Sequence, residues 1–238
     1  MSGGAQGIVF VHGGKHDGRC WGPTMDVIRA TAPSVPQLAV DLPGRRGTTG
    51  DTTLAGCVRS VVGQIEDAGL RRFMLVGHSL AGITVPLVAS ELGAERVSRI
   101  VAIACCVPPQ SKTTADTVNL PTRLVANLLD YVPMPRWLAR QMFCNGMSPA
   151  QTDFSLGVLV PDAPDTPGLT RAAADRSTLP AQIPRTWVLT LRDRTLPPRV
   201  QLRFAANLGA SEIVPIDTGH NPMIADPERL ASIIVERL

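Results

Sequence analysis

Short apolar runs recur along the chain, and none of them alternates regularly with polar residues. Runs of this kind are typical of strands that are buried on both faces of a parallel sheet. The sequence therefore predicts about six strands of a mainly parallel sheet. They lie at Gly7 to Val11, Gln37 to Val40, Phe73 to Val76, Arg99 to Cys106, Thr186 to Leu191 and Glu212 to Ile216.

Segments long enough for helices separate most of these runs. Strands that alternate with helices predict an α/β domain with a doubly wound sheet. The length of 238 residues suits one such domain with an insertion. The predicted helices are Met25 to Ala32, Leu54 to Ala68, Ile83 to Leu92, Arg199 to Leu208 and Pro227 to Leu238.

One interval, from Val107 to about Pro184, contains several prolines and no convincing strand. We expect residues 107–184 to form a helical cap, inserted into a core made of residues 1–106 and 185–238. Such a cap would cover the carboxyl edge of the sheet, where open α/β folds bind ligands. The interval includes an amphipathic stretch around Leu124 to Met142. Candidates for the pocket lining are Leu128, Trp137, Met142 and Phe143, although packing within the cap is the simpler explanation for any one of them.

Composition narrows the choice of partner. The net charge is +3, its basic residues form no block, and aromatic residues make up only 4% of the chain. These features disfavour nucleic acid and membrane surfaces as partners and favour a small molecule.

The five cysteines show no metal-binding spacing, so we expect reduced, packed thiols and no metal. The start of the chain has no leader pattern, and no apolar run is long enough for a membrane span. These two features predict a cytoplasmic protein. A homodimer is compatible with the sequence.

Ser79 is the candidate nucleophile, in the sequence Gly77-His78-Ser79-Leu80-Ala81-Gly82. It stands between a predicted strand and a predicted helix. A sharp strand-to-helix turn projects its central residue out of the sheet, and only small neighbours allow the two backbones to approach. The alternative is an ordinary turn rich in glycine and serine.

A serine hydroxyl needs a base to take its proton and an acid to orient that base. The chain has four histidines, and His220 follows the last predicted strand, at the edge where Ser79 also emerges. His78 directly precedes Ser79, and adjacent side chains at a sharp turn point apart. Asp193 follows the fifth strand and completes the order Ser, Asp, His. Two alternatives are open: His220 only caps the final helix, and Asp193 forms a surface ion pair with Arg192 or Arg194.

The backbone N–H groups of Gly14 and Leu80 are the expected donors of an oxyanion hole. Leu80 follows the nucleophile, and His12-Gly13-Gly14 follows the first strand, where glycine lets the backbone approach a substrate. The glycine spacing does not match G-x-G-x-x-G, so we expect no dinucleotide cofactor, and no other cofactor is required.

These motifs, together with Asp41-Leu42-Pro43-Gly44 and Gly219-His220, resemble the α/β-hydrolase superfamily over nearly the whole chain outside the cap. More narrowly, His12-Gly13-Gly14-Lys15-His16 with Trp21 looks like the branch that holds plant methyl esterases and hydroxynitrile lyases. The resemblance implies an α/β-hydrolase fold, and we place His16, Trp21 and Asn221 in the substrate pocket. Ala81 replaces a usual glycine, which should leave the turn intact, and the antiparallel hairpin that often precedes the first parallel strand is expected to be missing.

The resemblance also bears on the reaction. Lyases of this branch typically have a threonine after the first-strand histidine and a lysine after the catalytic histidine, where this chain has Gly13 and Asn221. We therefore expect a serine hydrolase that cleaves a small, uncharged or apolar carboxylic ester through an acyl-enzyme. Three alternatives remain open. They are lyase chemistry with Lys15 as the cation, a biosynthetic tailoring role such as lactone formation or cyclisation, and ligand binding without turnover.

Overall fold

Six strands form one sheet in the computed structural model, which describes residues 7–117, 134–160 and 167–238. The strand order is β2-β1-β3-β4-β5-β6, and every neighbouring pair is parallel. The predicted doubly wound α/β fold is confirmed. The strands are β1 (Gly7–Val11), β2 (Gln37–Val40), β3 (Phe73–His78), β4 (Val97–Ile103), β5 (Arg185–Thr190) and β6 (Glu212–Ile216).

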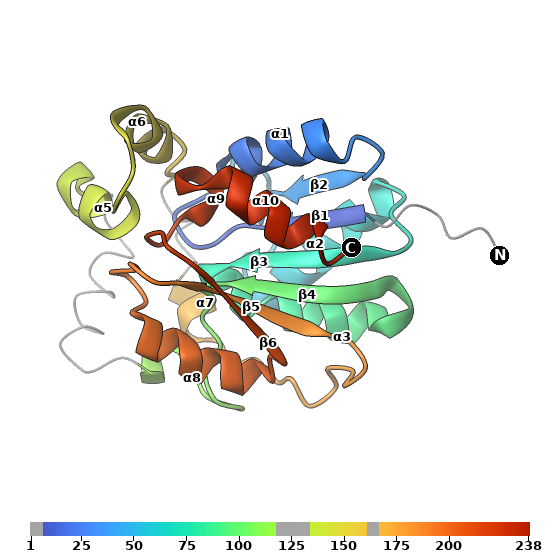
Figure 1. The fold of residues 1–238 in the computed structure, drawn as a ribbon. Helices are drawn as coiled ribbons and strands as arrows, with labels where there is room; N and C mark the ends of the chain where they lie inside the picture. The colour runs from blue at the N-terminus through green and yellow to red at the C-terminus, as the bar shows by residue number, and fades with distance from the viewer. Residues whose placement is uncertain (1–6, 118–133, 161–166) are drawn as a thin grey trace.

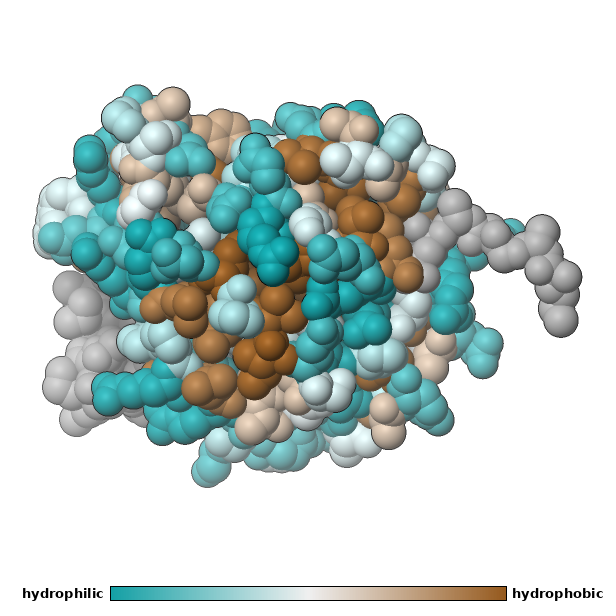
Figure 2. Space-filling model, in the orientation of Figure 1, coloured by the Kyte–Doolittle hydropathy of each residue, from teal (hydrophilic) through white to brown (hydrophobic). Residues whose placement is uncertain are grey.

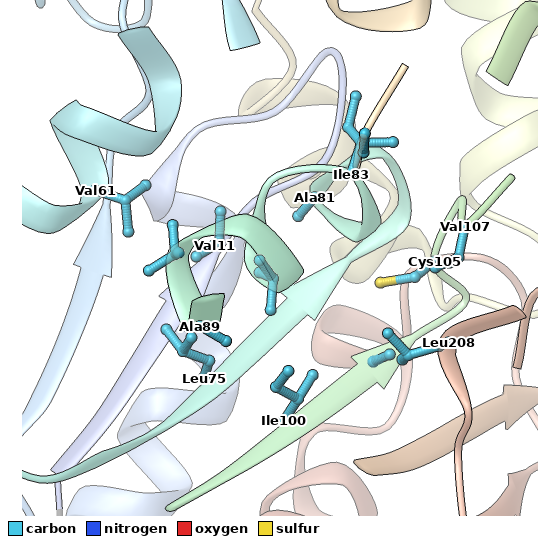
Figure 3. Close-up of a cluster of buried hydrophobic side chains, with 14 of the residues drawn as sticks. Val11, Val61, Leu75, Ala81, Ile83, Ala89, Ile100, Cys105, Val107 and Leu208 are labelled. Carbon is cyan, nitrogen blue, oxygen red and sulfur yellow. The ribbon is translucent and has the colours of Figure 1, made fainter. Parts of the chain in front are cut away.

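Helices cover both faces of this sheet (Figure 1). Ile8 and Phe10 of β1 pack on one side with residues of η1, α1, α9 and α10. Val9 and Val11 pack on the other side with residues of α2, α3 and α8, part of which Figure 3 shows. Alternate strand residues therefore supply two separate cores. The helical elements are η1 (Gly18–Trp21), α1 (Gly22–Thr31), α2 (Leu54–Asp67), η2 (Ser79–Gly82), α3 (Val85–Arg96), α8 (Pro198–Leu208), α9 (Pro222–Ala225) and α10 (Pro227–Val235).

The largest differences from the expected strands lie in β3 and β4. Strand β3 continues through His78 because Gly77 and His78 pair with Ala102 and Ile103 of β4. Strand β4 ends at Ile103, three residues earlier than its apolar run. The backbone turns at Ala104, which has a φ of 44°, so the buried Cys105 and Cys106 leave the sheet. The helix expected from Ile83 starts at Val85, after the short helix η2.

The segment between β4 and β5 contains helices and no strand in its described residues. These helices are η3 (Thr114–Thr117), α5 (Arg136–Phe143), α6 (Pro149–Gly157) and α7 (Pro167–Arg171). Figure 1 shows α5 and α6 beyond the carboxyl ends of the strands. Buried residues of α5 form a small apolar cluster with residues near α6. The boundaries of the cap remain a prediction, and Leu128 lies outside the described residues.

Strand β6 forms one edge of the sheet and is only half covered. Figure 2, drawn in the orientation of Figure 1, shows apolar residues gathered on the surface that faces the reader. Pro215 lies within β6, which suits an edge strand because proline cannot donate to a further ladder. Within the described residues, no helix is long and apolar enough to cross a membrane.

Candidate active site

The turn at Ser79 has the geometry that the sequence predicts. Ser79 directly follows β3 and begins η2 with a φ of 52°, a left-handed conformation that is strained for a residue with a side chain. The end of β4 packs tightly against this turn. The Cys106 N–H donates to the Ser79 carbonyl at 2.7 Å, and a Cβ on Gly82 would lie 2.5 Å from the Cys106 carbonyl oxygen. Glycine at 82 therefore permits the approach that holds Ser79 beyond the sheet.

Ser79, His220 and Asp193 form a continuous hydrogen-bonded chain. His220 Nε2 is 3.0 Å from Ser79 Oγ, and His220 Nδ1 is 2.7 Å from Asp193 Oδ2. His220 comes from the loop between β6 and α9, and Asp193 from the loop after β5. A carboxylate beside Nδ1 keeps the proton on that nitrogen, so Nε2 is free to accept the serine proton.

Asp193 is held as a carboxylate by its surroundings. Oδ1 accepts hydrogen bonds from the N–H groups of Thr195 at 2.7 Å and Leu196 at 2.8 Å, and Oδ2 accepts one from Thr190 Oγ1 at 3.0 Å. Burial alone would raise the pKa of Asp193, but attraction to His220 and these hydrogen bonds outweigh it and hold the pKa below its usual value. The alternative of a surface ion pair with Arg192 or Arg194 is not observed in the described part of the chain, where Asp193 pairs with His220 and Arg192 pairs with Asp217.

The residues expected to supply the oxyanion hole come from two segments that pack against each other at Ser79. A Cβ on Gly13 would be 2.8 Å from Ser79 Cβ, and one on Gly14 would be 3.5 Å from Leu80 Cδ2. The loop after β1 therefore lies against the nucleophile turn. Leu80 occupies the first turn of η2, where backbone N–H groups have no partner within the helix. The role of both N–H groups remains a prediction.

His12 fixes the peptide that contains the Gly14 N–H group. The Leu42 N–H donates to His12 Nε2 at 3.1 Å, so the ring proton is on Nδ1, which donates to the Gly13 carbonyl at 2.8 Å. The Gly13 carbonyl and the Gly14 N–H belong to one planar peptide and point in opposite directions. His12 thus orients the expected donor. The sequence shows only that His12 directly follows a buried strand, which does not distinguish this supporting role from that of a base.

All four histidines of the chain surround this site. His78 is fully buried and its Nε2 donates to the His220 carbonyl at 2.9 Å, so it supports the loop of the base and does not face the serine hydroxyl. The pKa of His78 lies well below its ordinary value, mainly because the ring is buried and to a smaller extent because His220 and His16 repel its charged form. Burial likewise lowers the pKa of His12 to about 4. Both rings are therefore neutral near pH 7.

The neutral state of His12 predicts a loss of stability in mild acid. Unfolded His12 takes up a proton below its ordinary pKa of 6.5, whereas the folded ring does so only below about 4. Stability should therefore be fully present above pH 6.5 and fall by about 3 kcal/mol from this residue as the pH approaches 4. Urea unfolding of the wild type and of His12→Asn between pH 7.5 and 4.5 measures the difference. An equal pH slope in the two proteins would contradict the prediction.

The expected pocket residues that the structure describes lie in three different surroundings. His16 and Asn221 are buried and hydrogen-bonded to each other beside the site. Two assignments need correction. Trp21 is fully buried in the core, where its ring packs against Phe10 at 5.0 Å, and Trp137 on α5 is 66% exposed. Met142 packs against the apolar cluster of α5.

Phe143, the last residue of α5, packs against the proposed base. Its ring stacks on His220 at 5.8 Å and meets His16 edge-on at 5.4 Å. The sequence makes Phe143 a candidate for pocket lining or cap packing, but it gives no signal for this contact with His220. Among the described residues, no group of three or more His, Cys, Asp or Glu side chains is arranged to hold a metal ion.

Comparison with known proteins agrees with this architecture. The model of a family described as "Alpha/beta hydrolase family" matches residues 8–233. The chain therefore belongs to the alpha/beta hydrolase family. A curated relative, the probable esterase PIR7A of rice (Oryza sativa subsp. indica), is 30% identical over 134 residues, which represent 50% of this chain and 46% of the relative. The chain thus spans about half the length of the curated relatives it matches.

Solved structures show the same fold over almost the full chain. An extracellular alpha/beta-hydrolase from a Paenibacillus species, described as sharing structural and functional homology with tobacco salicylic acid binding protein 2, has a TM-score of 0.85 at 21% identity. The methylesterase MES16 from Arabidopsis has a TM-score of 0.74 at 18% identity. In both comparisons, 98% of each chain is covered. MES16 is a methylesterase, the class that the sequence motifs resemble.

Proposed function

We propose that this protein is a serine hydrolase that cleaves small carboxylic esters. The observation that carries the proposal is the hydrogen-bonded chain from Ser79 through His220 to Asp193. Family membership and the esterase name of the rice relative support the same reaction. Every group in the proposed reaction comes from the protein, the substrate or water.

In the first half of the reaction, Ser79 Oγ attacks the acyl carbon of the ester, and its proton passes to His220 Nε2. The carbonyl oxygen becomes an oxyanion that accepts hydrogen bonds from the N–H groups of Gly14 and Leu80. The intermediate collapses when the bond to the alcohol oxygen breaks and His220 returns the proton to that oxygen. The alcohol leaves, and the acyl group stays on Ser79.

In the second half, a water molecule takes the place of the alcohol. His220 accepts a proton from the water, whose oxygen attacks the acyl carbon. A second oxyanion forms and collapses, His220 returns the proton to Ser79 Oγ, and the carboxylic acid is released. Asp193 stays ionised throughout and stabilises the protonated ring of His220. Its lowered pKa suits this role.

A small, largely apolar ester is the substrate class that we favour. Phe143 lies against His220, and its neighbours Ala139 and Cys144 are buried in an apolar cluster. Asn221 follows His220 and donates its amide to His16, so position 221 supplies a neutral group and not the cation that lyases of the resembled branch use. Hydrolysis is therefore favoured over lyase chemistry. The cytoplasmic location and the homodimer stay predictions from the sequence.

Two measurements on the purified protein test this function. We expect turnover of p-nitrophenyl esters from acetate to octanoate, and a single adduct on Ser79 after treatment with a fluorophosphonate probe, located by peptide mass spectrometry. Turnover in ¹⁸O-labelled water should place one labelled oxygen in the acid product. Ser79→Ala is the matched control and should take no adduct. Absence of both turnover and adduct in the folded wild type would refute the proposal.

A further inference from the structure

His16 joins two loops of the site through one buried ring, and its partner Asn221 extends this contact to α6. Its Nδ1 lies 2.8 Å from the Gly14 carbonyl, and Asn221 Nδ2 lies 3.1 Å from its Nε2. Asn221 also approaches Ser155 Oγ of α6 at 3.5 Å. His16 is 1% exposed, and both Asn221 and Ser155 are fully buried. The loop after β1, the loop of His220 and a helix of the predicted cap thus meet at one polar junction.

The hydrogen bonds and the orientation of the Asn221 amide together define the tautomer of His16. A carbonyl oxygen can only accept, so Nδ1 carries the proton and donates it to Gly14. Nε2 then has a free lone pair, which accepts from the Asn221 amide N–H. Asn221 therefore selects the neutral ring with its donor directed at Gly14. Reversal of the amide would place two acceptors together and lose this bond.

Three consecutive backbone carbonyl groups of this loop accept hydrogen bonds, and that of Gly14 is the middle one. The Gly13 carbonyl accepts from His12 at 2.8 Å, the Gly14 carbonyl from His16 at 2.8 Å, and the Lys15 carbonyl from the Val160 N–H at 2.9 Å. Glycines at 13 and 14 leave this backbone free to rotate in the absence of such bonds. Lys15 has a strained φ of 61°, which persists only when its surroundings hold it.

We propose that His16 is a positioning residue, held in its active tautomer by Asn221, that keeps the Gly14 N–H directed at the oxyanion. The proposal rests on the proposed function, because an oxyanion forms only if Ser79 attacks a carbonyl. His12 fixes the peptide before Gly14, and His16 fixes the peptide after it. With both flanking peptides held, Gly14 cannot turn its N–H away, and the donor is already in place when charge develops.

Two substitutions separate the contacts of His16. An asparagine side chain places its amide nitrogen near the position of the histidine Nδ1, so His16→Asn keeps a donor for Gly14. A glutamine side chain reaches the position of Nε2 and keeps the contact to Asn221, but it leaves the Gly14 carbonyl without its partner. We expect His16→Gln to lower kcat about 10- to 100-fold with little change in KM, less than the 10²- to 10³-fold that loss of a whole donor causes. We expect His16→Asn to retain most of kcat.

The readout must separate positioning from a general effect on folding. The fluorophosphonate titrates the fraction of active sites, so kcat is expressed per titrated site. An alkyl trifluoromethyl ketone, which forms a tetrahedral adduct bearing an oxyanion on Ser79, should bind His16→Gln more weakly in proportion to the loss of kcat/KM. The matching methyl ketone forms no such stable adduct, and its affinity should not change. Asn221→Leu removes the donor to Nε2 and should lower kcat several-fold in the same manner, which tests the proposal even if a His16 variant does not fold.

Three results would overturn the proposal. These are equal kcat per site in His16→Asn and His16→Gln, an unchanged kcat per site in Asn221→Leu, and a loss of kcat without weaker binding of the trifluoromethyl ketone. Failure of the proposed function looks different, because Ser79 in the wild type would then take no probe and hydrolyse no ester.

Discussion

Replacing Ser79 with alanine is expected to lower kcat for ester hydrolysis by about 10⁴- to 10⁶-fold while KM changes little. The substitution removes the only protein atom that bonds to the acyl carbon in the proposed reaction, and it leaves His220 Nε2 without the hydroxyl that lies 3.0 Å away. Alanine at a φ of 52° is about as strained as serine, so the turn and the thermal stability should be preserved. Steady-state kinetics with a p-nitrophenyl ester and a thermal melt measure both quantities.

Ser90→Ala is the matched control for this experiment. Ser90 lies on α3, the helix that follows the same turn, and its hydroxyl donates to the Pro86 carbonyl at 3.0 Å, with no contact to the triad. Its kcat should equal that of the wild type. An active Ser79→Ala protein, free of contaminating esterase, would exclude the acyl-enzyme mechanism.

The arrangement of the sheet could be predicted because burial on both faces leaves a strong signal. β1, β2 and β6 were predicted with the observed bounds. The end of β4 could not be predicted, because Cys105 and Cys106 are as apolar and buried as the strand that they follow. Only the turn at Ala104 takes them out of the sheet, and alanine gives no sequence signal for a positive φ.

The triad geometry could be anticipated because each candidate follows a parallel strand, and the carboxyl ends of parallel strands meet at one edge. The pocket was harder to predict. The amphipathic stretch shows that Trp137 belongs to a helix, but not which face that helix buries, and the exposed ring of Trp137 shows the limit of this inference. The motif places Trp21 in the pocket, whereas its packing on Phe10 gives it a role in the core.

The supporting residues could not be found from sequence because their contacts cross long separations. His12 is held by Leu42, and His16 by Asn221, 30 and 205 positions away. Histidine in either place has no local pattern that distinguishes a neutral hydrogen-bonded ring from a base. Its role follows only from which partner faces each ring nitrogen, because that partner decides the tautomer.

Replacing Asp193 with asparagine is expected to lower kcat by about 10⁴-fold and to leave the fold intact. Asp193 Oδ1 accepts from two backbone N–H groups, so the asparagine carbonyl oxygen takes that place and the amide nitrogen faces His220 Nδ1. A ring facing an N–H donor carries its proton on Nε2 and can no longer accept the proton of Ser79. The loss therefore comes from the wrong tautomer and not from a misplaced residue.

Asp217→Asn provides the comparison, since this carboxylate is exposed, pairs with Arg192 in the neighbouring loop and touches no triad residue. It should retain the wild-type kcat. The rate of inactivation by a fluorophosphonate should fall in Asp193→Asn about as strongly as kcat, because both reactions begin with deprotonation of Ser79. A normal inactivation rate together with a low kcat would instead place Asp193 in deacylation alone and contradict the tautomer argument.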